Sequence, residues 1–152
     1  MEVRYRQAKQ EDADLLIDIY NKSFYADFLR YGECPAYGKT KAQMQKSIAT
    51  FPKEIIICDN NPAGAMSVEN RGNGEYYVGC LCVIPAYQHR GIGTQAIRHL
   101  LESHEDWTLL SLITPEDKEE NIHFYTQKCG FSIAGTELDG NVRVARLVLE
   151  RK

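Results

Sequence analysis

The sequence lacks long apolar runs, internal repeats and an excess of positive charge, and each absence excludes a class of protein. Its apolar runs are far shorter than the ~20 residues of a membrane helix, and residues 1–4 do not begin a signal peptide. The formal net charge is -3, and no low-complexity tract or internal repeat is present. Nucleic acids and anionic membranes attract basic surfaces, so we expect neither as the main partner.

The cysteines and histidines also lack the sequence spacings that are typical of disulfide and metal sites. The five cysteines are odd in number and include no Cys-x-x-Cys pair, and the four histidines show no metal-ligand spacing. Cys80 and Cys82 would point to one face of a strand, which is poor geometry for a shared disulfide or metal site. We therefore expect no metal, reduced thiols and a cytoplasmic location. Most thiols are expected to be buried packing groups, with one reactive nucleophile as the alternative.

What the sequence does contain fits one globular domain over residues 1–152. Its residues are 43% apolar and 26% charged, enough for a core that folds unaided. Helices are expected from about residue 11 and over residues 40–49, 91–103 and 115–128. Thr40 is the expected cap of the helix over residues 40–49. Thr114 is the expected cap of the helix over residues 115–128, and Pro115 is expected in its first turn. The expected strands cover residues 3–8, 54–58, 63–68, 75–84, 107–113, 131–137 and 142–150.

Residues 78–101 form the stretch around which the chemistry is organised. A continuous apolar run stops at Pro85, a polar turn with Gly91 and Gly93 follows, and apolar residues then recur at helical spacing. This order predicts a buried strand, a glycine loop and a helix. The first N–H groups of a helix lack intrahelical partners and lie at the positive end of its dipole. Since the glycines clear the approach and Arg90 adds a charge, we expect the junction to bind a phosphate.

Two other phosphate-binding loops do not fit this stretch. A Walker loop requires Gly-Lys-Ser/Thr, and the run from Gly91 to Thr94 offers no lysine at that place. A dinucleotide-binding loop requires an acidic residue about 20 positions further on, at the end of a second strand. No acidic residue ends the strand that follows Trp107. Both alternatives are therefore excluded.

The loop resembles the acyl-CoA pyrophosphate loop of the GNAT acetyltransferase superfamily, whose pattern is Gln/Arg-x-x-Gly-x-Gly/Ala. The matching run follows a strand that ends in Leu81-Cys82-Val83, and it reads Pro85-Ala86-Tyr87-Gln88-His89-Arg90-Gly91-Ile92-Gly93-Thr94. Residues 121–131 are similar to the superfamily's second motif, a helix that carries a tyrosine, here Tyr125, and closes in Gly-Phe. The two motifs follow each other in the right order and at about the right distance.

This resemblance implies a fold, a cofactor and a reaction. The fold is α+β, with a mixed, mostly antiparallel central sheet flanked by helices. The reaction transfers the acetyl group of acetyl-CoA to a primary amine by direct attack in a ternary complex, with coenzyme A as product. The alternative is a catalytically silent CoA-binding sensor or interaction domain. The implied cofactor-binding residues are Leu81, Cys82, Val83, Gln88, His89, Arg90, Gly91, Ile92, Gly93, Thr94, Asn121 and Tyr125.

The resemblance also implies catalytic roles. A phenol with a pKa near 10 is protonated at neutral pH and can donate to a departing thiolate, which is the role implied for Tyr125; packing under the sheet is the alternative. Many relatives carry a glutamate four residues before the position matched by Leu81, where this sequence has Tyr77. Glu75 lies on the same strand face and is the leading candidate for the general base. Tyr77, Glu33 and a water chain are the alternatives.

The acceptor is expected near the aromatic segment of residues 23–37. In the superfamily the region between the first two strands varies with substrate, which favours Tyr31, Glu33 and Tyr37 as substrate-binding residues. The alternative is a helix and turn that bury these aromatic rings. A small-molecule amine and a peptide or protein amine both fit as acceptors. An edge strand in the closing hairpin offers a way to pair two subunits as a homodimer.

Overall fold

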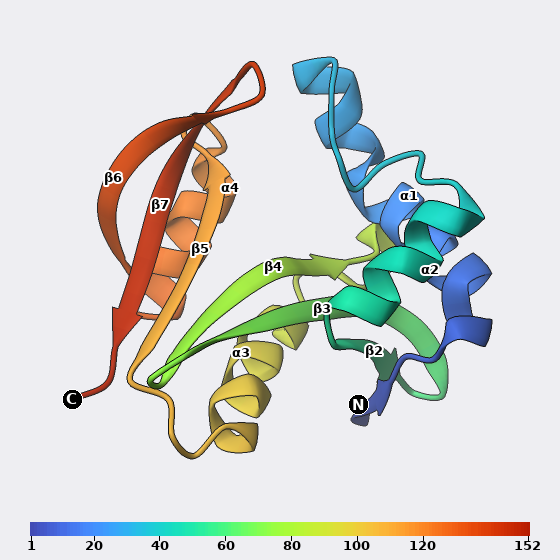
Figure 1. The fold of residues 1–152 in the computed structure, drawn as a ribbon, viewed down its shortest axis with the longest axis horizontal. Coiled ribbons are helices and arrows are strands. Elements are labelled where there is room, and N and C mark those ends of the chain that lie inside the picture. The colour runs from blue at the N-terminus through green and yellow to red at the C-terminus, as the bar shows by residue number, and fades with distance from the viewer. The chain divides into compact units, whose positions relative to one another are not determined.

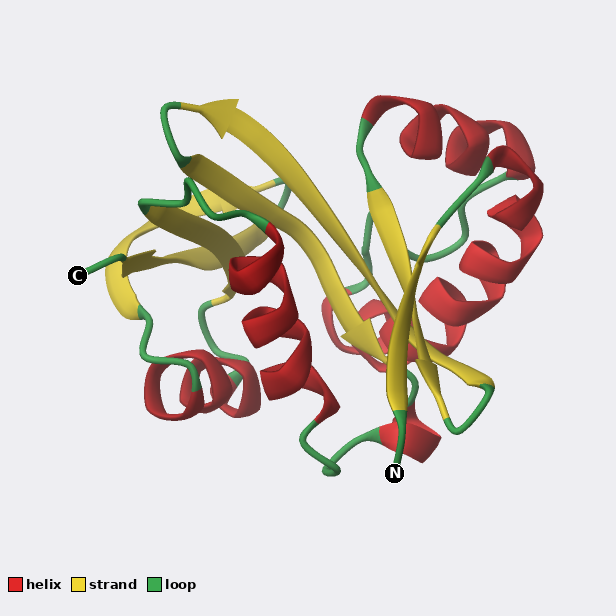
Figure 2. Ribbon diagram, turned by 90° about the horizontal axis from the view of Figure 1, so that it is seen from below, coloured by secondary structure: helices red, strands yellow, loops and turns green.

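The structure is a computed structural model that describes residues 1–152 (Figure 1). Figure 2 distinguishes its helices, strands and loops by colour. The strands are β1 (Val3–Gln7), β2 (Lys53–Cys58), β3 (Asn61–Gly72), β4 (Glu75–Val83), β5 (Leu109–Pro115), β6 (Ser132–Asp139) and β7 (Val142–Glu150). The α-helices are α1 (Ala13–Tyr31), α2 (Lys41–Thr50), α3 (Ile92–Ser103) and α4 (Glu119–His123). Three further helices are η1 (Gln10–Asp12), η2 (Pro85–Tyr87) and the π-helix η3 (Phe124–Lys128).

The seven strands form one mixed sheet with flanking helices. They are hydrogen-bonded in the order β1-β2-β3-β4-β5-β7-β6. The pairs β1/β2, β2/β3, β5/β7 and β6/β7 are antiparallel, whereas β4 and β5 are parallel. The predicted α+β fold with a mixed, mostly antiparallel sheet is therefore confirmed. None of the helices combines the length and the apolar character that crossing a membrane requires.

The chain folds into two compact units. Unit 1 contains residues 1–68 and 80–96, and unit 2 contains residues 69–79 and 97–152. The elements β3, β4 and α3 contribute residues to both units. The expectation of a single domain over residues 1–152 stays a prediction.

Unit 1 has a hydrophobic core between its helices and its strands. The side chains of Leu16 and Ile19 on α1, Met44 on α2 and Ile55 on β2 are fully buried in this core. At the start of α2 the Thr40 side chain accepts a hydrogen bond from the Gln43 N–H, and the Gln43 side chain accepts one from the Thr40 N–H. This capping box confirms the cap predicted at Thr40.

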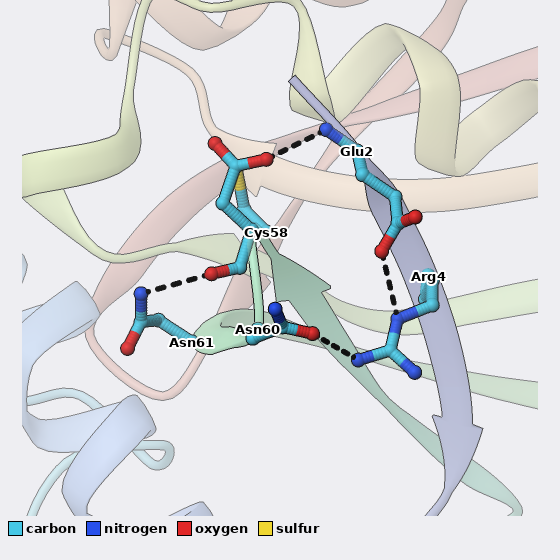
Figure 3. A network of polar contacts seen from close by, with 6 residues as sticks. Glu2, Arg4, Cys58, Asn60 and Asn61 are labelled. Carbon is cyan, nitrogen blue, oxygen red and sulfur yellow. Dashed lines mark hydrogen bonds and ion pairs between the residues drawn. The ribbon is translucent and has the colours of Figure 1, made fainter.

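The turn between β2 and β3 is tied to the first residues of the chain (Figure 3). Asp59 and Asn60 have φ angles of 48° and 69°, as a two-residue hairpin turn requires. The Glu2 N–H donates to Asp59 Oδ1 at 2.7 Å, and the Arg4 guanidinium donates to Asn60 Oδ1 at 2.8 Å. Arg4 also lies 3.2 Å from the Glu2 carboxylate. These contacts fasten β1 beside β2, where Val3 is paired with Cys58.

Unit 2 is organised around β5. The first three residues of β4 pair with the first three of β5 in parallel, and the whole of β5 pairs with β7 in antiparallel register. Leu110 and Leu112 of β5 and Leu147 of β7 are buried, with at most 2% of each residue exposed. Every residue of β6 is exposed, and β6 is the last strand of the sheet. The predicted closing hairpin is confirmed, and one of its strands forms a sheet edge.

The first helix is longer than the pattern of apolar residues indicated. α1 continues through most of the aromatic segment and ends at Tyr31. Gly32 follows with a φ of 74°, and its N–H donates to Phe28 O at 2.9 Å. A glycine in this left-handed conformation commonly ends a helix, so Gly32, rather than the crowding of aromatic residues, sets the boundary.

The predicted start of the last helix is wrong. Pro115 is the final residue of β5, opposite Val144 of β7, and does not stand in a helical first turn. Thr114 is also a strand residue, and it caps no helix because α4 begins only at Glu119, after Lys118. Hydrogen bonding to β7 extends the strand through a sequence that locally favours a helix start.

Candidate functional site

β4 leads through η2 into a loop that ends at α3. The Tyr87 N–H donates to Ile84 O at 2.8 Å, and the Gln88 N–H donates to Pro85 O at 3.2 Å. The side-chain amide of Gln88 donates to Val83 O at 2.9 Å. The strand, loop and helix predicted for residues 78–101 are confirmed. Gln88 shapes this turn with its side chain, a structural role that its place in the motif did not reveal.

The end of the loop is in the left-handed region of backbone conformation. His89 has a φ of 64° and Gly91 a φ of 81°. Glycine adopts such angles at no steric cost. A Cβ added at Gly91 would meet no atom within 4 Å, so this glycine is required by its backbone angle rather than by lack of room.

Three backbone N–H groups, those of Ile92, Gly93 and Thr94, lie at the N-terminus of α3. The first helical bond runs from the Gln95 N–H to Gly91 O at 3.1 Å, so these three groups precede the helical ladder. They lie at the positive end of the dipole of a 12-residue helix. The guanidinium of Arg90, an exposed residue, lies 5.3 Å from the Tyr87 ring centre. Bare amides beside a cation suit a phosphate group.

Gly64 of β3 allows a close approach of the chain at the end of β4. A Cβ at Gly64 would lie 2.1 Å from the Cys82 carbonyl oxygen and 3.2 Å from Val83 Cα. Any other residue there would force the two backbones apart. The next contact is a hydrogen bond of 2.7 Å from the Ile84 N–H to Ala63 O. Sequence reasoning missed this role, and the available signal was a glycine inside an apolar strand.

Tyr125 lies in the π-helix η3 of unit 2. Its ring is 7% exposed and makes edge contacts with Phe124 and Phe131, at centre distances of 5.0 and 5.5 Å. The Phe131 N–H donates to Tyr125 O at 2.9 Å, and Gly130 has a φ of 82°. π-Helical turns are rare and are often found at functional sites. The sequence predicted a helix with a tyrosine that closes at a glycine, but not the widened turn.

Asn121 has a structural partner. Its Nδ2 donates to the hydroxyl of Thr114 at 3.0 Å, and Thr114 is 4% exposed. The hydrogen bond joins α4 to the end of β5. It provides the partner that a buried threonine hydroxyl needs, and the implied contact of Asn121 with the cofactor stays a prediction.

The two base candidates on β4 have different surroundings. Glu75 is the first residue of β4 and stands opposite Leu109. Tyr77 is half-buried, and the Arg71 guanidinium lies 4.0 Å from its ring centre. Burial raises the pKa of Tyr77 above its usual value, and the opposing charge of Arg71 does not cancel this. Because its hydroxyl stays protonated at neutral pH, Tyr77 is a poor base.

Of the three expected acceptor residues, only Tyr37 borders a hollow. The Tyr37 ring stacks on the Phe28 ring, with 4.7 Å between the two ring centres. The centre of the Tyr25 ring lies 5.9 Å from that of Tyr37. Tyr31 instead lies under the Arg30 guanidinium at 5.1 Å. The hollow has a volume of about 390 Å³, and neither Tyr31 nor Glu33 lines it. Its lining residues are Asn21, Lys22, Tyr25, Tyr37, Ile84, Pro85 and Ala86.

The remaining polar residues do not form a metal centre. No group of three or more His, Cys, Asp or Glu side chains is placed to hold an ion. The five cysteines are free thiols. In unit 1 the candidate groups are the amides before α3, the end of β4 and the hollow beside it. In unit 2 the candidate group is Tyr125.

Comparison with known proteins places this chain in a family. The family model described as Acetyltransferase (GNAT) family matches residues 14–131. The chain belongs to this family, and the resemblance seen in the two sequence motifs is confirmed.

Individual proteins are similar to this chain in sequence or in fold. The uncharacterized protein YrkN of Bacillus subtilis is 33% identical over 79 residues, which are 52% of this chain and 43% of YrkN. The chain therefore matches less than half the length of that relative. An acetyltransferase from Thermus thermophilus has a TM-score of 0.80 at 16% identity, with 99% of this chain and 98% of the other covered. PaiA N-acetyltransferase from Thermoplasma acidophilum, solved with coenzyme A, has a TM-score of 0.80 at 16% identity, with 99% and 100% covered.

Proposed function

We propose that this protein transfers the acetyl group of acetyl-CoA to a primary amine of an acceptor, by direct attack of the amine in a ternary complex. The single observation that carries the proposal is the junction of β4 and α3, where three amides precede the helical ladder beside an open loop. Family membership and the coenzyme A complex of the PaiA relative support acetyl-CoA as the ligand of this junction.

The amides of Ile92, Gly93 and Thr94 would hold the pyrophosphate, with Arg90 supplying a positive charge. Gly91 precedes these groups in a left-handed conformation, and a Cβ placed on it would meet no atom within 4 Å. A hydrogen bond to a charged group contributes about 1.5–3 kcal/mol, so three converging amides can supply most of a cofactor's affinity.

The backbone of Leu81, Cys82 and Val83 would bind the pantetheine arm in the way that an added strand binds to a sheet edge. The close approach at Gly64 fixes the position of this segment. An N–H group near Cys82 or Val83 would also donate to the thioester oxygen as it gains charge. One such donor contributes about 2.7–4 kcal/mol in known acyl-transfer sites. The bulge or splay that would free these groups stays a prediction.

Bound acetyl-CoA supplies an activated thioester, and the chain's own groups then manage two protons. Tyr125 is the proposed acid for the departing sulfur, because a phenol is protonated at neutral pH. Glu75 is the proposed base for the attacking ammonium, with a water chain as the alternative. The raised pKa of Tyr77, caused mainly by burial, argues against Tyr77 in the basic role.

The hollow beside Tyr37 is the proposed acceptor site. It adjoins Ile84 and Pro85, directly after the strand segment proposed to carry the acyl arm. Two tyrosine rings and a stacked phenylalanine suit a small amine with an apolar or aromatic body. A peptide or protein amine stays the second possibility, because the hollow is shallow and open.

Two measurements test this function. The first is calorimetry with coenzyme A, for which we expect micromolar or tighter binding. The second is coenzyme A release from acetyl-CoA across a panel of polyamines, aromatic amines, amino acids and peptides. Amine-dependent release supports the proposal. Binding with no turnover for any amine would instead support a silent CoA-binding sensor, a function favoured by the tyrosine at the position of the family's glutamate. No binding would exclude both.

A further inference from the structure

The hollow beside Tyr37 is lined by charges of one sign only. Its lining residues all belong to unit 1, and they are Asn21, Lys22 and Tyr25 of α1, Tyr37 of the segment after α1, and Ile84, Pro85 and Ala86 after β4. Lys22 is the only charged residue among them, and no Asp or Glu lines the hollow. In ligand pockets a few placed polar groups fix the orientation of the ligand. The polar groups of this hollow therefore bear on the kind of acceptor that it takes.

The aromatic wall of the hollow is held in place by two kinds of contact. The Gly38 N–H donates to Asn21 Oδ1 at 2.9 Å, which ties the segment that carries Tyr37 back to α1. The Tyr37 ring also stacks on the Phe28 ring, with 20° between the two ring planes. The Tyr25 ring lies beside Tyr37 and lines the same hollow. An acceptor with an apolar or aromatic body therefore meets a wall that is already formed.

The side chains of α1 in this hollow present hydrogen-bond donors. Because Asn21 Oδ1 already accepts the Gly38 N–H, the other end of the Asn21 amide is an NH2 donor. The ammonium of Lys22 carries donors only. On the side that follows β4, the carbonyl groups of Ile84 and Pro85 each already accept a backbone hydrogen bond. The hollow thus offers donors to an anion and no carboxylate to a cation.

Lys22 has an ion-pair partner that it can leave easily. Its Nζ lies 2.9 Å from Asp18 Oδ2, four residues earlier on α1, and the two side chains are 57% and 54% exposed. An ion pair that is so open to solvent is weak, and the lysine side chain is long and flexible. Asp18 itself does not line the hollow. The ammonium can therefore turn toward an anion in the hollow with little loss of stability.

We propose that the acceptor is an amine that also carries a carboxylate on an apolar or aromatic body, and that Lys22 binds this carboxylate. The inference rests on the proposed function, because it names the substrate class of the proposed acceptor site. The carboxylate lies on the α1 side, where Asn21 adds a hydrogen bond, and the amino group lies toward Ile84. In the transfer the amine nitrogen bonds to the acetyl carbon and the carbon–sulfur bond breaks. One proton leaves the nitrogen and one reaches the departing sulfur.

Two other classes of acceptor fit the lining less well. A polyamine would bring its remaining ammonium groups beside Lys22, with no carboxylate in the lining to pair with them. Repulsion between like charges is one of the ways in which a site rejects a wrong ligand. An aromatic amine without an anionic group fits between the rings but leaves Lys22 unused. The carboxylate is thus the feature that separates the favoured acceptor from both.

Matched amines test the proposal through the release of coenzyme A from acetyl-CoA by the full chain. Tyrosine and tyramine share one aromatic body and differ in the carboxylate, and tyrosinamide replaces the carboxylate by a neutral amide of similar size. We expect kcat/KM for tyrosine to exceed that for the other two about fivefold, the upper range for an ion pair open to solvent. Lys22→Met should abolish this preference, and Lys22→Glu should reverse it. Equal values for the three amines, or a preference that survives in Lys22→Met, would overturn the proposal.

The matched control is Lys41→Met, which should keep the preference of the parent. Lys41 is also an exposed lysine whose partner, Asp14 at 3.7 Å, belongs to α1, and it does not line the hollow.

Binding of para-hydroxyphenylpropionate, which has the carboxylate but no amine, separates this inference from the proposed function. Saturation-transfer NMR should show that this acid binds to the parent and not to Lys22→Met, and failure of the parent to bind it would overturn the proposal. Binding that depends on Lys22, without turnover of any amine, would refute acetyl transfer and support the carboxylate site. Turnover of amines without a preference for the carboxylate would do the reverse.

Discussion

The N-terminus of α3 and the π-helix around Tyr125 are two candidate functional sites that are built in contrasting ways. At α3 the useful groups are backbone amides, and the space before Gly91 is open. At η3 the useful group is a side chain, 7% exposed and held between two phenylalanine rings. A backbone site depends on small residues in the right order, whereas a side-chain site depends on what surrounds it. The first kind can be recognised in a sequence, and the second needs tertiary structure.

The largest expected effect comes from filling the backbone site. Gly93→Val should weaken coenzyme A binding on the order of 1000-fold, because loss of two or three amide contacts costs about 1.5–3 kcal/mol each. The helical Cβ tilts toward the N-terminus, so the new side chain covers the amides. Valine is no worse than glycine within a helix, so the fold should persist. Calorimetry measures the change.

The matched control for that variant is Gly135→Val. A Cβ at Gly135 also meets nothing within 4 Å, and this glycine has no left-handed φ. It stands in β6, far in sequence from the amides before α3. Equal weakening by both substitutions, or unchanged affinity in Gly93→Val, would refute the assignment of the pyrophosphate to this loop.

The side-chain site is tested by Tyr125→Phe. Loss of the proposed proton donor should lower turnover about 10- to 1000-fold, while affinity for coenzyme A stays within about twofold. Steady-state release of coenzyme A, with an amine found active in the panel, measures turnover. Unchanged turnover would leave Tyr125 with a packing role only.

Tyr76→Phe is the control for removal of a hydroxyl in the same unit. The Tyr76 hydroxyl donates to Asp106 at 2.6 Å, and the residue is 3% exposed. This substitution should cost about 1–3 kcal/mol of stability and leave turnover near the parent value. A matching loss of turnover in both variants would show that the effect of Tyr125→Phe is structural.

A smaller effect is expected at the strand that leads to the backbone site. Gly64→Ala places a Cβ 2.1 Å from the Cys82 carbonyl oxygen, and overpacking of this kind costs about 1–3 kcal/mol. For a chain of this size that lowers the melting temperature by about 2–4 °C per kcal/mol. Thermal unfolding measures it, with Gly135→Ala as the control in open space. A melting temperature equal to that of the control would contradict the close approach.

The smallest effect is expected away from both sites. Asp12 accepts two hydrogen bonds from Arg6, at 2.9 and 3.0 Å, and one from the Lys9 N–H at 2.7 Å. The Arg6 hydrogen bonds hold the pKa of Asp12 below its usual value. The stabilisation is therefore present above the unfolded-state pKa, near 3.9, and is lost as the pH falls through the lowered folded-state pKa.

Asp12→Asn should accordingly destabilise the protein by about 1 kcal/mol at pH 7. The difference from the parent should shrink below about pH 4. Urea denaturation at several pH values measures it. Asp14→Asn is the control. The Asp14 carboxylate also faces a cation, Lys41 at 3.7 Å, but its side chain is 77% exposed, so this ion pair is open to solvent. A difference that does not change with pH would show that the ion pair is not the cause.

Much of the fold could be predicted from local patterns. Alternating residues located β1 and β7, and the cap predicted at Thr40 located the start of α2, because these preferences act between neighbours in sequence. The failures came where distant segments decide. Pro115 joined β5 because β7 offers it a hydrogen-bonding partner strand, and the length of α1 was underestimated because no break precedes Gly32.

The candidate site was predicted in the same uneven way. The strand, glycine loop and helix of the junction were recognised because glycines and their spacing are written in the sequence, and phosphate binding there stays a prediction. The role of Gly64 was missed, since it depends on the carbonyl of Cys82 in another strand. Tyr37 lies beside a hollow, and its role as an acceptor residue stays a prediction. Tyr25 lines the same hollow but was not chosen, because its contact with Tyr37 follows from the path of the chain after α1. The roles of individual site residues and the cytoplasmic location stay predictions.

By itself, the sequence determined the order of strands and helices, the family and the glycine loop before α3, because each rests on short-range spacing or on the absence of side chains. Only the tertiary structure decided the left-handed turn at Gly91, the π-helical setting of Tyr125 and the meeting of Lys53, Tyr20 and Ser67. The two sets differ for a physical reason. Backbone geometry is encoded by neighbouring residues, whereas burial and the pairing of charges are properties of residues that only folding brings together.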